Sequence, residues 1–303
     1  MFKLGQNKSL INIKEVKIDL EKDLQSLTEV NLELIFGLKF IKSELSIHNL
    51  RLDTLAFDND NNSFIIIEYK RDRSFSVIDQ GYAYLSLMLN NKADFILEYN
   101  ESVNTSLRKD DVDWSQSKVI FISPSFSKYQ QQAINFKDLP IELWEITKYQ
   151  NDLIQYSRLK SPETSESINK ISKSSGVVNR VTEEVKVYTE EDHLKSANEG
   201  ISSLYEEFKD QILNLDDKIE IIPKKKYIAF KASSNFIDIL PQKEKIKFWL
   251  NMSKGKLNDP YNLSRDVSEI GHWGNGDYEF SINSSSDFIN LMPLIKQSYE
   301  INK

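Results

Sequence analysis

Residues 51–70 read RLDTLAFDNDNNSFIIIEYK, and this stretch decides how the first half of the chain is interpreted. The segment DNDNN is rich in residues that favour turns, and the segments on either side are apolar or alternate between apolar and polar residues. The stretch therefore predicts a β-hairpin. Its second strand is apolar over residues 64–67 and then ends in Glu68, Tyr69 and Lys70, although a buried strand needs no charges for its packing.

The expected loop fixes which residues of the hairpin face each other. If residues 59–62 form the loop, the residues that flank it are paired and, five pairs further along, Asp53 falls opposite Glu68. Directly opposed side chains lie about 4.5–5.5 Å apart at Cβ. Lys70 lies on the same face as Glu68, because alternate residues of a strand point the same way. One turn thus gathers two carboxylates and an ammonium group.

Two neighbouring carboxylates repel each other, and the pKa of one of them rises unless a cation offsets the repulsion. Mg²⁺ prefers oxygen ligands and typically binds one or two carboxylates together with water and a substrate phosphate. Such an ion lowers the pKa of a bound water and stabilises charge on phosphate oxygens. Lys70 would orient or help to deprotonate the attacking water, or compensate phosphate charge. The pattern predicts a metal-dependent phosphodiesterase site at Asp53, Glu68 and Lys70.

A plainer interpretation must be weighed against this one. Glu-x-Lys on a strand is common and usually forms a solvated cross-strand ion pair worth less than about 1 kcal/mol. Three features favour a site: the apolar run before Glu68, the position of Asp53, and a following helix that carries Gln80 and Tyr84. The last two residues are four apart and share a helical face. Gly81 allows close backbone approach, at some cost in helix propensity.

With these residues in place, residues 15–147 resemble the PD-(D/E)XK nuclease superfamily, and within it the branch of the NucS/EndoMS-type DNA endonucleases. The helix EKDLQSLTEVNLELIFGLKFI and the Arg51-Leu52-Asp53 strand carry the resemblance to that branch. Leu52 stands where the superfamily motif has proline, which is chemically harmless because only the aspartate is a ligand. The resemblance implies an α/β restriction-endonuclease-like core, a mixed sheet flanked by helices, followed by a smaller α+β domain.

The resemblance also implies roles for the individual residues. Asp53 and Glu68 would bind Mg²⁺ or Mn²⁺ together with the carbonyl of Tyr69. Lys70 would act on the water or the phosphate, with Gln80 positioning it.

Three further roles follow with alternatives left open. Tyr84 would support the site or contact the substrate. Arg51, on the same side of its strand as Asp53, would contact phosphate or form a surface ion pair. An acidic residue of the first helix often completes such sites, and Glu29 or Glu33 are the candidates.

The composition of the 303 residues excludes some classes of protein. There is no cysteine, so disulfides, thiolate metal sites and cysteine nucleophiles are excluded. The net charge of −7 excludes a simple basic DNA-coating protein but not a nuclease, whose metal site collects carboxylates. No apolar stretch predicts a signal peptide or a membrane span, so we expect a cytoplasmic chain without a membrane partner.

Hydrophobic periodicity predicts a nuclease-like domain over residues 1–150. The expected helices are 18–44, 75–90 and 127–136, and the expected strands are 48–58, 63–70, 93–99, 118–123 and 141–147.

Residues 151–187 are expected to be a linker, or in part a packed connecting helix, because Ser, Thr, Asn and charged residues dominate there. Residues 188–303 predict an α+β accessory domain with mostly antiparallel strands, and they resemble an uncharacterised domain found behind nuclease-like domains. The expected elements are a helix near 194–213, strands at 219–222, 227–232, 236–241, 246–252 and 277–282, and a helix at 286–299.

Two polar segments of the accessory domain carry no assigned chemistry. GHWGNGDYEF, residues 271–280, lacks the strand–loop–helix context of a phosphate loop. His272 and Trp273 could stack on a base, but packing in a turn is favoured. The Lys224–Lys226 run could contact a nucleic-acid backbone, but a solvated loop is favoured.

The sequence therefore predicts a Mg²⁺- or Mn²⁺-dependent DNA endonuclease, with a role in DNA repair or in defence against foreign DNA suggested by the resemblance. The alternative is a non-catalytic nucleic-acid-binding or regulatory protein that keeps the fold. A third interpretation makes the accessory domain a sensor that controls the nuclease. Single- or double-stranded DNA, and even RNA, would suit the core, and a homodimer is left open.

Overall fold

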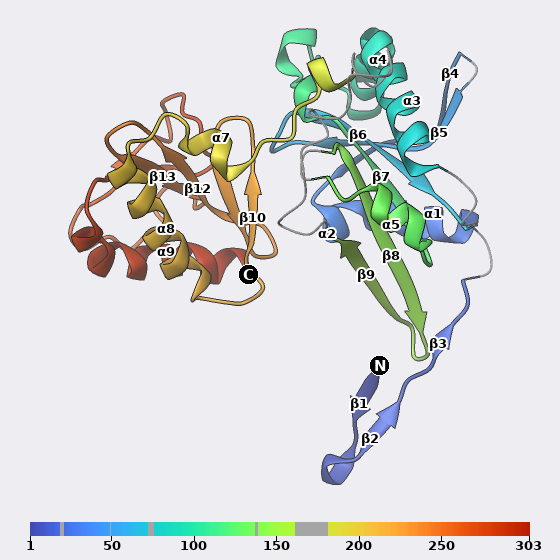
Figure 1. Cartoon of the computed structure of the whole chain (residues 1–303), viewed down its shortest axis with the longest axis horizontal. Coiled ribbons are helices and arrows are strands. Elements are labelled where there is room, and N and C mark those ends of the chain that lie inside the picture. The colour runs from blue at the N-terminus through green and yellow to red at the C-terminus, as the bar shows by residue number, and fades with distance from the viewer. Residues whose placement is uncertain (19–20, 49, 72–75, 137–138, 161–180) are drawn as a thin grey trace. The chain divides into compact units, whose positions relative to one another are not determined.

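The computed structural model describes the chain except for residues 19–20, 49, 72–75, 137–138 and 161–180 (Figure 1). Contacts between Cα atoms divide it into two compact units, Met1–Val187 and Tyr188–Lys303, and each is described by itself. Among the described residues, no helix is both long enough and apolar enough to cross a membrane.

The first unit is built on a mixed seven-stranded sheet. Its strands are β3 (Glu15–Val16), β4 (Lys39–Ile47), β5 (Leu50–Asp58), β6 (Ser63–Tyr69), β7 (Lys118–Ser123), β8 (Ile141–Tyr149) and β9 (Leu153–Leu159). They are ordered β3-β8-β7-β6-β5-β4, and β9 pairs with β8. The pairs β6–β7 and β7–β8 are parallel and the others are antiparallel. A hairpin of β1 (Phe2–Leu4) and β2 (Leu10–Asn12), joined by η1 (Gln6–Lys8), precedes this sheet.

Helices cover both faces of this sheet (Figure 1). They are α1 (Glu21–Val30), α2 (Leu32–Phe36), α3 (Val77–Asn90), α4 (Lys92–Val103) and α5 (Lys128–Ala133), with the short helices η2 (Lys109–Asp111) and η3 (Trp114–Gln116). The central strand β6 is buried along its whole length. Phe64 and Ile66 belong to the core formed with α3 and α4, whereas Ile65 and Ile67 belong to the core formed with α1 and α2. The continuous apolar run is thus explained by cover on both faces.

The predicted helix over residues 18–44 is wrong in its second half. The helical part ends with α2, because Gly37 adopts the left-handed conformation with φ 68° and its N–H bonds to the Glu33 carbonyl. Residues 39–47 instead form β4, whose inward-facing residues include Ile41 and Leu45. Two apolar residues four apart, such as Ile41 and Leu45, lie on one face of a helix but also on one face of a strand. Periodicity therefore did not reveal that the helix gives way to a strand after Gly37.

Two further expectations fail in the first unit. The apolar run predicted as a strand at residues 93–99 lies within α4, where Phe95 and Tyr99, four apart, are buried on one helical face. The segment 151–187, expected to be a linker or in part a packed connecting helix, contains the unexpected strand β9, whereas the second alternative fits residues 181–184, a helical stretch next to which Val185, like Val181 within it, is buried in the first unit's core. Residues 161–180 of that segment lie outside the described residues.

The second unit has an antiparallel six-stranded sheet with helices packed on one face. Its strands are β10 (Glu220–Pro223), β11 (Ile228–Lys231), β12 (Asn235–Pro241), β13 (Ile246–Leu250), β14 (Arg265–Asp266) and β15 (Tyr278–Ile282), ordered β10-β11-β12-β13-β15-β14. Its helices are α7 (Glu190–Leu194), α8 (Glu199–Leu213) and α9 (Phe288–Asn302), with η5 (Ser285–Asp287) before α9. Phe208 of α8 and Ile295 of α9 share one core with Phe248 of β13. The strands and the two long helices predicted here are confirmed.

Candidate active site

The hairpin forms with the register that the sequence predicts. Residues 59–62 make the turn, in which the Asp58 carboxylate accepts hydrogen bonds from the backbone N–H groups of residues 60 and 61. Pairing of β5 with β6 runs from Asp58–Ser63 to Thr54–Ile67, so Asp53 and Glu68 come next along the ladder. At this end, Asp53 Oδ2 accepts a hydrogen bond of 3.0 Å from the backbone N–H of Tyr69.

Glu68 and Lys70 form a close ion pair that is not a solvated surface contact. Lys70 Nζ lies 2.7 Å from Glu68 Oε1, and the Glu68 residue is only 3% exposed. The backbone N–H of Lys70 bonds to the Ile122 carbonyl of β7, which continues the parallel pairing beyond β6. The second carboxylate oxygen, Glu68 Oε2, is buried and has no hydrogen bond of ordinary geometry among the described residues. A buried carboxylate oxygen without a donor is rare and needs an explanation.

Helix α3 brings its two polar residues to the same carboxylate. Gln80 Nε2 lies 3.2 Å from Glu68 Oε1 and 2.9 Å from the Tyr84 hydroxyl. The Tyr84 hydroxyl in turn donates to the Arg51 carbonyl at 3.4 Å, which ties α3 to β5. Gly81 lets the helix approach the sheet, because a Cβ built there would lie 2.5 Å from Ile141 Cδ1. The structure therefore gathers residues that lie far apart in the sequence.

The electrostatics of the site favour binding of a proton or another cation. Burial raises the pKa of Asp53, against the lowering effects of the Tyr69 N–H and of Lys70. Burial also raises the pKa of Glu68, and the charge of Asp53 raises it further. Tyr84 stays protonated, since burial and the charge of Glu68 raise the pKa of its hydroxyl. Burial and mutual repulsion oppose the ionisation of both carboxylates at once. A divalent cation bound between them would offset this cost.

The two acidic candidates of the first helical segment lie elsewhere. Glu29 accepts hydrogen bonds from Thr54 Oγ1 at 2.5 Å and from Gln25 Nε2 at 3.0 Å. These contacts are on the face of the sheet that α1 covers, whereas Glu68 belongs to the face that α3 covers. Glu33 is exposed in α2. We therefore leave both residues out of the proposed ligand set.

A different acidic residue, Glu44 of β4, acts on the site and was missed by the sequence analysis. Although burial dominates the raised pKa of Asp53, the charge of Glu44 raises it further and that of Arg51 lowers it. Glu44 has a φ of 52° within β4, and the pairs on either side of it, Ser43–Thr54 and Leu45–Leu52, place it opposite Asp53. It was missed because residues 39–44 were expected to be helical. The charge of Arg51 lowers the pKa of Asp53, as expected for two residues on the same side of one strand.

The donors gathered here fit a hard divalent cation. The Asp53 carboxylate and the unsatisfied Glu68 Oε2 are the oxygens that Mg²⁺ and Mn²⁺ prefer, and the Tyr69 carbonyl belongs to the residue between Glu68 and Lys70. Within the described part of the chain, no group of three or more His, Cys, Asp or Glu residues is arranged to bind a metal. The candidate set thus has two carboxylates, and water and substrate would have to supply further ligands.

The first unit is thus an α/β domain whose central strand ends in a buried carboxylate–lysine cluster. An uncharacterised protein of Haemophilus influenzae (strain KW20 / Rd) is 51% identical over 289 residues, which cover 95% of this chain and 96% of that protein. The chain belongs to the same family as that protein. Residues 190–302, nearly the whole second unit, match a domain of unknown function, DUF5655.

Solved structures give only a distant likeness. An EndoMS–dsDNA complex is 17% identical with a TM-score of 0.27, covering 41% of this chain and 46% of that one. A repair endonuclease from Pyrococcus abyssi is 20% identical with a TM-score of 0.23, covering 40% of this chain and 45% of that one. Pyrococcus furiosus SfsA in complex with Ca²⁺ is 15% identical with a TM-score of 0.26, covering 46% and 65%. The chain spans less than half of the first two, and likeness at this level says nothing about its reaction.

Proposed function

We propose that the first unit is a Mg²⁺- or Mn²⁺-dependent DNA endonuclease of the PD-(D/E)XK type, which hydrolyses phosphodiester bonds. The observation that supports this most strongly is the state of Glu68. One of its oxygens binds Lys70 and Gln80, and the other is buried, unsatisfied and next to Asp53 in the strand ladder. A structural ion pair would satisfy both oxygens, whereas a ligand carboxylate keeps one oxygen available.

The residues have distinct roles in the proposed reaction. Asp53, Glu68 Oε2 and the Tyr69 carbonyl would hold the cation, which when bound would acidify water and neutralise phosphate charge. Lys70, held 2.7 Å from Glu68 Oε1, can donate a proton to a phosphate oxygen or hold the attacking water by a hydrogen bond. Gln80 is a positioning residue, since its amide fixes the Glu68 oxygen that Lys70 uses.

DNA is the proposed substrate, and Arg51 is its proposed phosphate contact. Arg51 lies two residues before Asp53 on the same side of β5, and its charge lowers the pKa of Asp53. This position would let the Arg51 guanidinium pair with a phosphate bound at the Asp53 carboxylate. The choice between single- and double-stranded DNA is left to experiment. A role in DNA repair or in defence against foreign DNA follows from the sequence resemblance and is part of the proposal.

The test is cleavage of plasmid and of labelled single- and double-stranded oligonucleotides in Mg²⁺, Mn²⁺ or EDTA. We expect cutting by the wild type with metal and a loss of at least about 100-fold in Asp53→Asn and Lys70→Ala, since both groups stabilise the transition state. Glu101→Gln and Lys109→Ala change exposed residues of the same unit and serve as charge-matched controls.

Three outcomes would contradict the proposal. Cleavage that persists in EDTA would exclude the metal, and cleavage that persists in both site variants would exclude the site. Retention of DNA without cutting and without any need for metal would favour the non-catalytic nucleic-acid-binding protein.

A further inference from the structure

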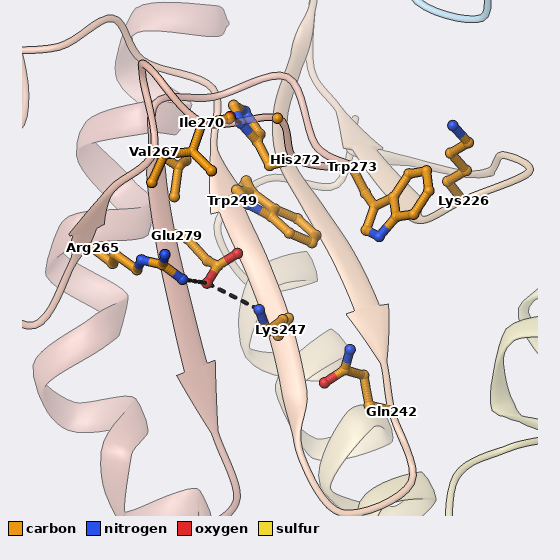
Figure 2. Close-up of a pocket in the computed structure, with 11 residues that line it drawn as sticks. Lys226, Gln242, Lys247, Trp249, Arg265, Val267, Ile270, His272, Trp273 and Glu279 are labelled. Carbon is orange, nitrogen blue, oxygen red and sulfur yellow. Dashed lines mark hydrogen bonds and ion pairs between the residues drawn. The ribbon is translucent and has the colours of Figure 1, made fainter.

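The second unit carries a cavity on the face of its sheet that α8 and α9 leave open. Phe248 of β13 points into the helix-covered core, so its neighbours Lys247 and Trp249 point to the opposite face. Glu279 of β15 is paired with Trp249 and lies there too. Together with Val267 and residues 270–273, these side chains line a cavity of about 480 Å³ (Figure 2). This volume lies within the roughly 300–1,000 Å³ of small-molecule sites.

Aromatic side chains form one part of the cavity lining. The Trp249 ring is buried and stacks with His272 at a centroid distance of 6.4 Å and an interplanar angle of 21°. Trp273, expected to pack in a turn, is instead 54% exposed, and Lys226 Nζ lies 4.1 Å from its ring centroid. Figure 2 shows Trp273 at the rim beside Lys226. An exposed indole supported by a cation offers a face on which a flat ring can stack.

A second observation points to a ligand: the indole nitrogen of Trp249. This N–H is buried and has no hydrogen-bond partner within the part of the chain that the structure describes. A buried indole donor usually finds an acceptor. Because Trp249 lines the cavity, we take its N–H as a candidate donor to a ligand with acceptor atoms.

The cavity is positively charged although the chain as a whole is negative. Lys226, Lys247 and Arg265 line it against the single carboxylate of Glu279. That carboxylate is shared, at 3.0 Å from Lys247 Nζ and 3.5 Å from Arg265. Two positive charges therefore remain in excess, which favours an anionic group in the cavity despite the net charge of −7.

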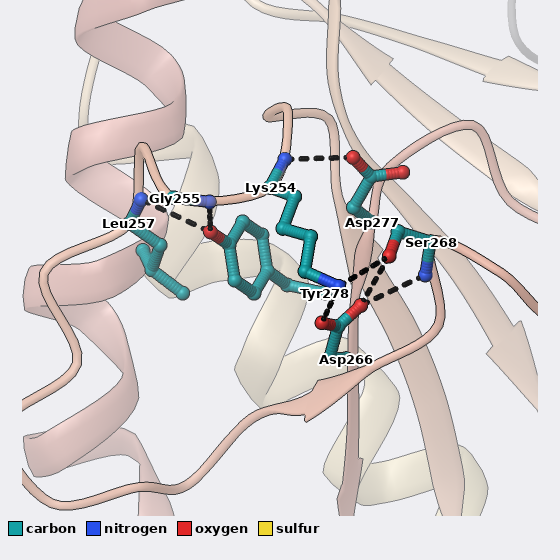
Figure 3. A network of polar contacts seen from close by, with 7 residues as sticks. All are labelled: Lys254, Gly255, Leu257, Asp266, Ser268, Asp277 and Tyr278. Atoms are coloured by element: carbon teal, nitrogen blue, oxygen red, sulfur yellow. Dashed lines mark hydrogen bonds and ion pairs between the residues drawn. The ribbon is translucent and has the colours of Figure 1, made fainter.

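Residues 266–277 contribute part of the cavity lining, and hydrogen bonds hold this segment in place at its start. Figure 3 shows Lys254, whose Nζ lies 2.8 Å from Asp266 Oδ2, and Ser268, whose hydroxyl donates to Asp266 Oδ1 at 2.6 Å. The backbone N–H of Lys254 bonds to Asp277, and that of Gly255 bonds to the Tyr278 hydroxyl. The cavity is thus formed before any ligand binds, which lowers the entropic cost of binding.

The end of the same segment is held by close packing. Asn275 bonds through its N–H to Asp238 and through its amide to the Tyr227 hydroxyl. A Cβ at Gly274 would lie 2.7 Å from the Trp249 ring, and one at Gly276 would lie 1.7 Å from the Leu250 carbonyl oxygen. Gly274 and Gly276 therefore allow the loop to lie against β13, which explains these two glycines without a phosphate loop.

We propose that this cavity binds a nucleotide unit, with the base stacked on Trp273 and the phosphate held by Arg265 and Lys247, whose side chains converge on Glu279 (Figure 2). A stacking face, an excess of cations and an unsatisfied N–H donor together match a flat base linked to an anion. The unit can be a free nucleotide or part of a strand, and the test distinguishes these sources. The site is independent of the proposed nuclease activity.

The test is binding to the full chain in EDTA, which prevents metal-dependent cleavage, by isothermal titration calorimetry. The probes are 5′-dAMP, 5′-dTMP, inorganic phosphate and a short single-stranded oligonucleotide. We expect Trp273→Ala to raise the Kd of the nucleotide probes about tenfold, the size expected for one stacked base. Arg265→Gln should weaken them by a similar factor. Tyr261→Ala removes an exposed aromatic outside the cavity, and Lys243→Gln removes an exposed cation outside it.

Each outcome decides the proposal. Saturable mononucleotide binding that both variants weaken supports a free nucleotide, and binding of the oligonucleotide alone, weakened in the same way, supports a strand. For the oligonucleotide, the quantity compared is the Kd of the wild type against that of Trp273→Ala. Any binding by the first unit is the same in both proteins and does not affect this comparison. The proposal is overturned if no probe binds at millimolar concentration, if phosphate binds as well as the nucleotides, or if the control variants lose as much as the cavity variants. Loss of DNA cleavage would leave these results unchanged.

Discussion

A single carboxylate, that of Glu68, determines the interpretation of the first unit. Its two oxygens differ: Oε1 binds Lys70 and Gln80, and Oε2 is buried without a partner in the described structure. Burial of such an oxygen costs free energy unless a ligand offsets it. The residue is therefore placed where a cation would stabilise the fold, as well as take part in the reaction that we propose.

Gln80 and Tyr84 should differ in importance, although they are bonded to each other. Gln80→Ala removes the donor to Glu68 Oε1, so we expect metal-dependent cleavage to fall by about 10–100-fold, as for other groups that orient metal ligands. Tyr84→Phe removes the contacts of its hydroxyl with Gln80, with the Arg51 carbonyl and with Glu68, but leaves the Gln80 and Lys70 donors to Glu68 in place, so its effect should stay below about tenfold. The measurements are cleavage rates and Mn²⁺ affinity at matched circular-dichroism spectra. If Gln80→Ala and Tyr84→Phe lost equal activity and both kept the wild-type Mn²⁺ affinity, the positioning role of Gln80 would be contradicted.

The sequence predicted that these residues lie together, because local rules are enough to place them. A four-residue turn fixed the register of Asp53 against Glu68, and helical spacing put Gln80 and Tyr84 on one face. It could not predict Glu44, because its effect depends on β4 being a strand and on an irregular backbone at that residue. Positions of this kind are set by tertiary contacts and carry little local signal.

At the scale of elements, the site depends on how closely α3 packs against the sheet. Gly81→Ala places a Cβ 2.5 Å from Cδ1 and 2.9 Å from Cγ1 of Ile141, which is itself buried. We expect a loss of about 1–3 kcal/mol in the free energy of unfolding, since overpacking outweighs the gain in helix propensity.

Two further variants test this packing by chemical denaturation. Adding Ile141→Val to Gly81→Ala removes the nearest atom and should recover part of the loss. Gly200→Ala in α8, where a Cβ would meet only Asn198 Oδ1 at 3.3 Å, should be nearly neutral. A Gly81→Ala protein as stable as the wild type would show that α3 does not need this close approach.

One carboxylate, that of Glu142 in β8, links side chains of the two neighbouring strands β7 and β9. It lies 2.7 Å from Lys118 of β7 and 3.4 Å from Arg158 of β9, and Trp144 donates to its second oxygen. Burial alone would raise its pKa, but the two cations hold the pKa of Glu142 well below its usual range. A depressed pKa means stability that is present above the unfolded-state pKa and is lost as pH falls through the folded-state value.

Glu142→Gln should therefore destabilise the protein by about 2 kcal/mol near pH 7. This is less than for a fully buried pair, because the Lys118 and Arg158 side chains are 31% and 39% exposed. Below about pH 4.5 the difference from the wild type should shrink, because Glu142 becomes protonated in the unfolded state while it stays ionised in the folded state. Thermal unfolding between pH 3 and pH 7 measures this. A constant difference across that range would contradict the assignment.

At the scale of the whole molecule, the first unit extends further than composition suggests. The polar stretch after residue 150 looked like a linker, yet β9, Val181 and Val185 belong to the first unit. Helices alternating with strands predicted the α/β class correctly, while β4, α4 and β9 were assigned wrongly or missed, as were the short strands β1, β2, β3 and β14. Short apolar segments fit a helix or a strand equally well, and pairing partners decide between them.

Truncation tests this boundary. A protein of residues 1–187 should fold and keep the metal-dependent activity proposed for the site. A protein of residues 1–160 loses Val181 and Val185, whose burial contributes about 3 kcal/mol in all, and should unfold at lower denaturant concentration. Equal stability of the two fragments would show that the two valines contribute nothing to the core.

The most direct test of the central claim is the stoichiometry of Mn²⁺ binding to the full chain, measured by electron paramagnetic resonance of the free ion. The site at the end of β6 predicts saturable binding in the wild type that is lost in Asp53→Asn and Glu68→Gln. Lys70→Ala should keep it, because Lys70 pairs with the Glu68 oxygen that is not the proposed ligand. Binding that is unchanged in both carboxylate variants, or no Mn²⁺ binding by the wild type, would contradict a metal-dependent nuclease at this site.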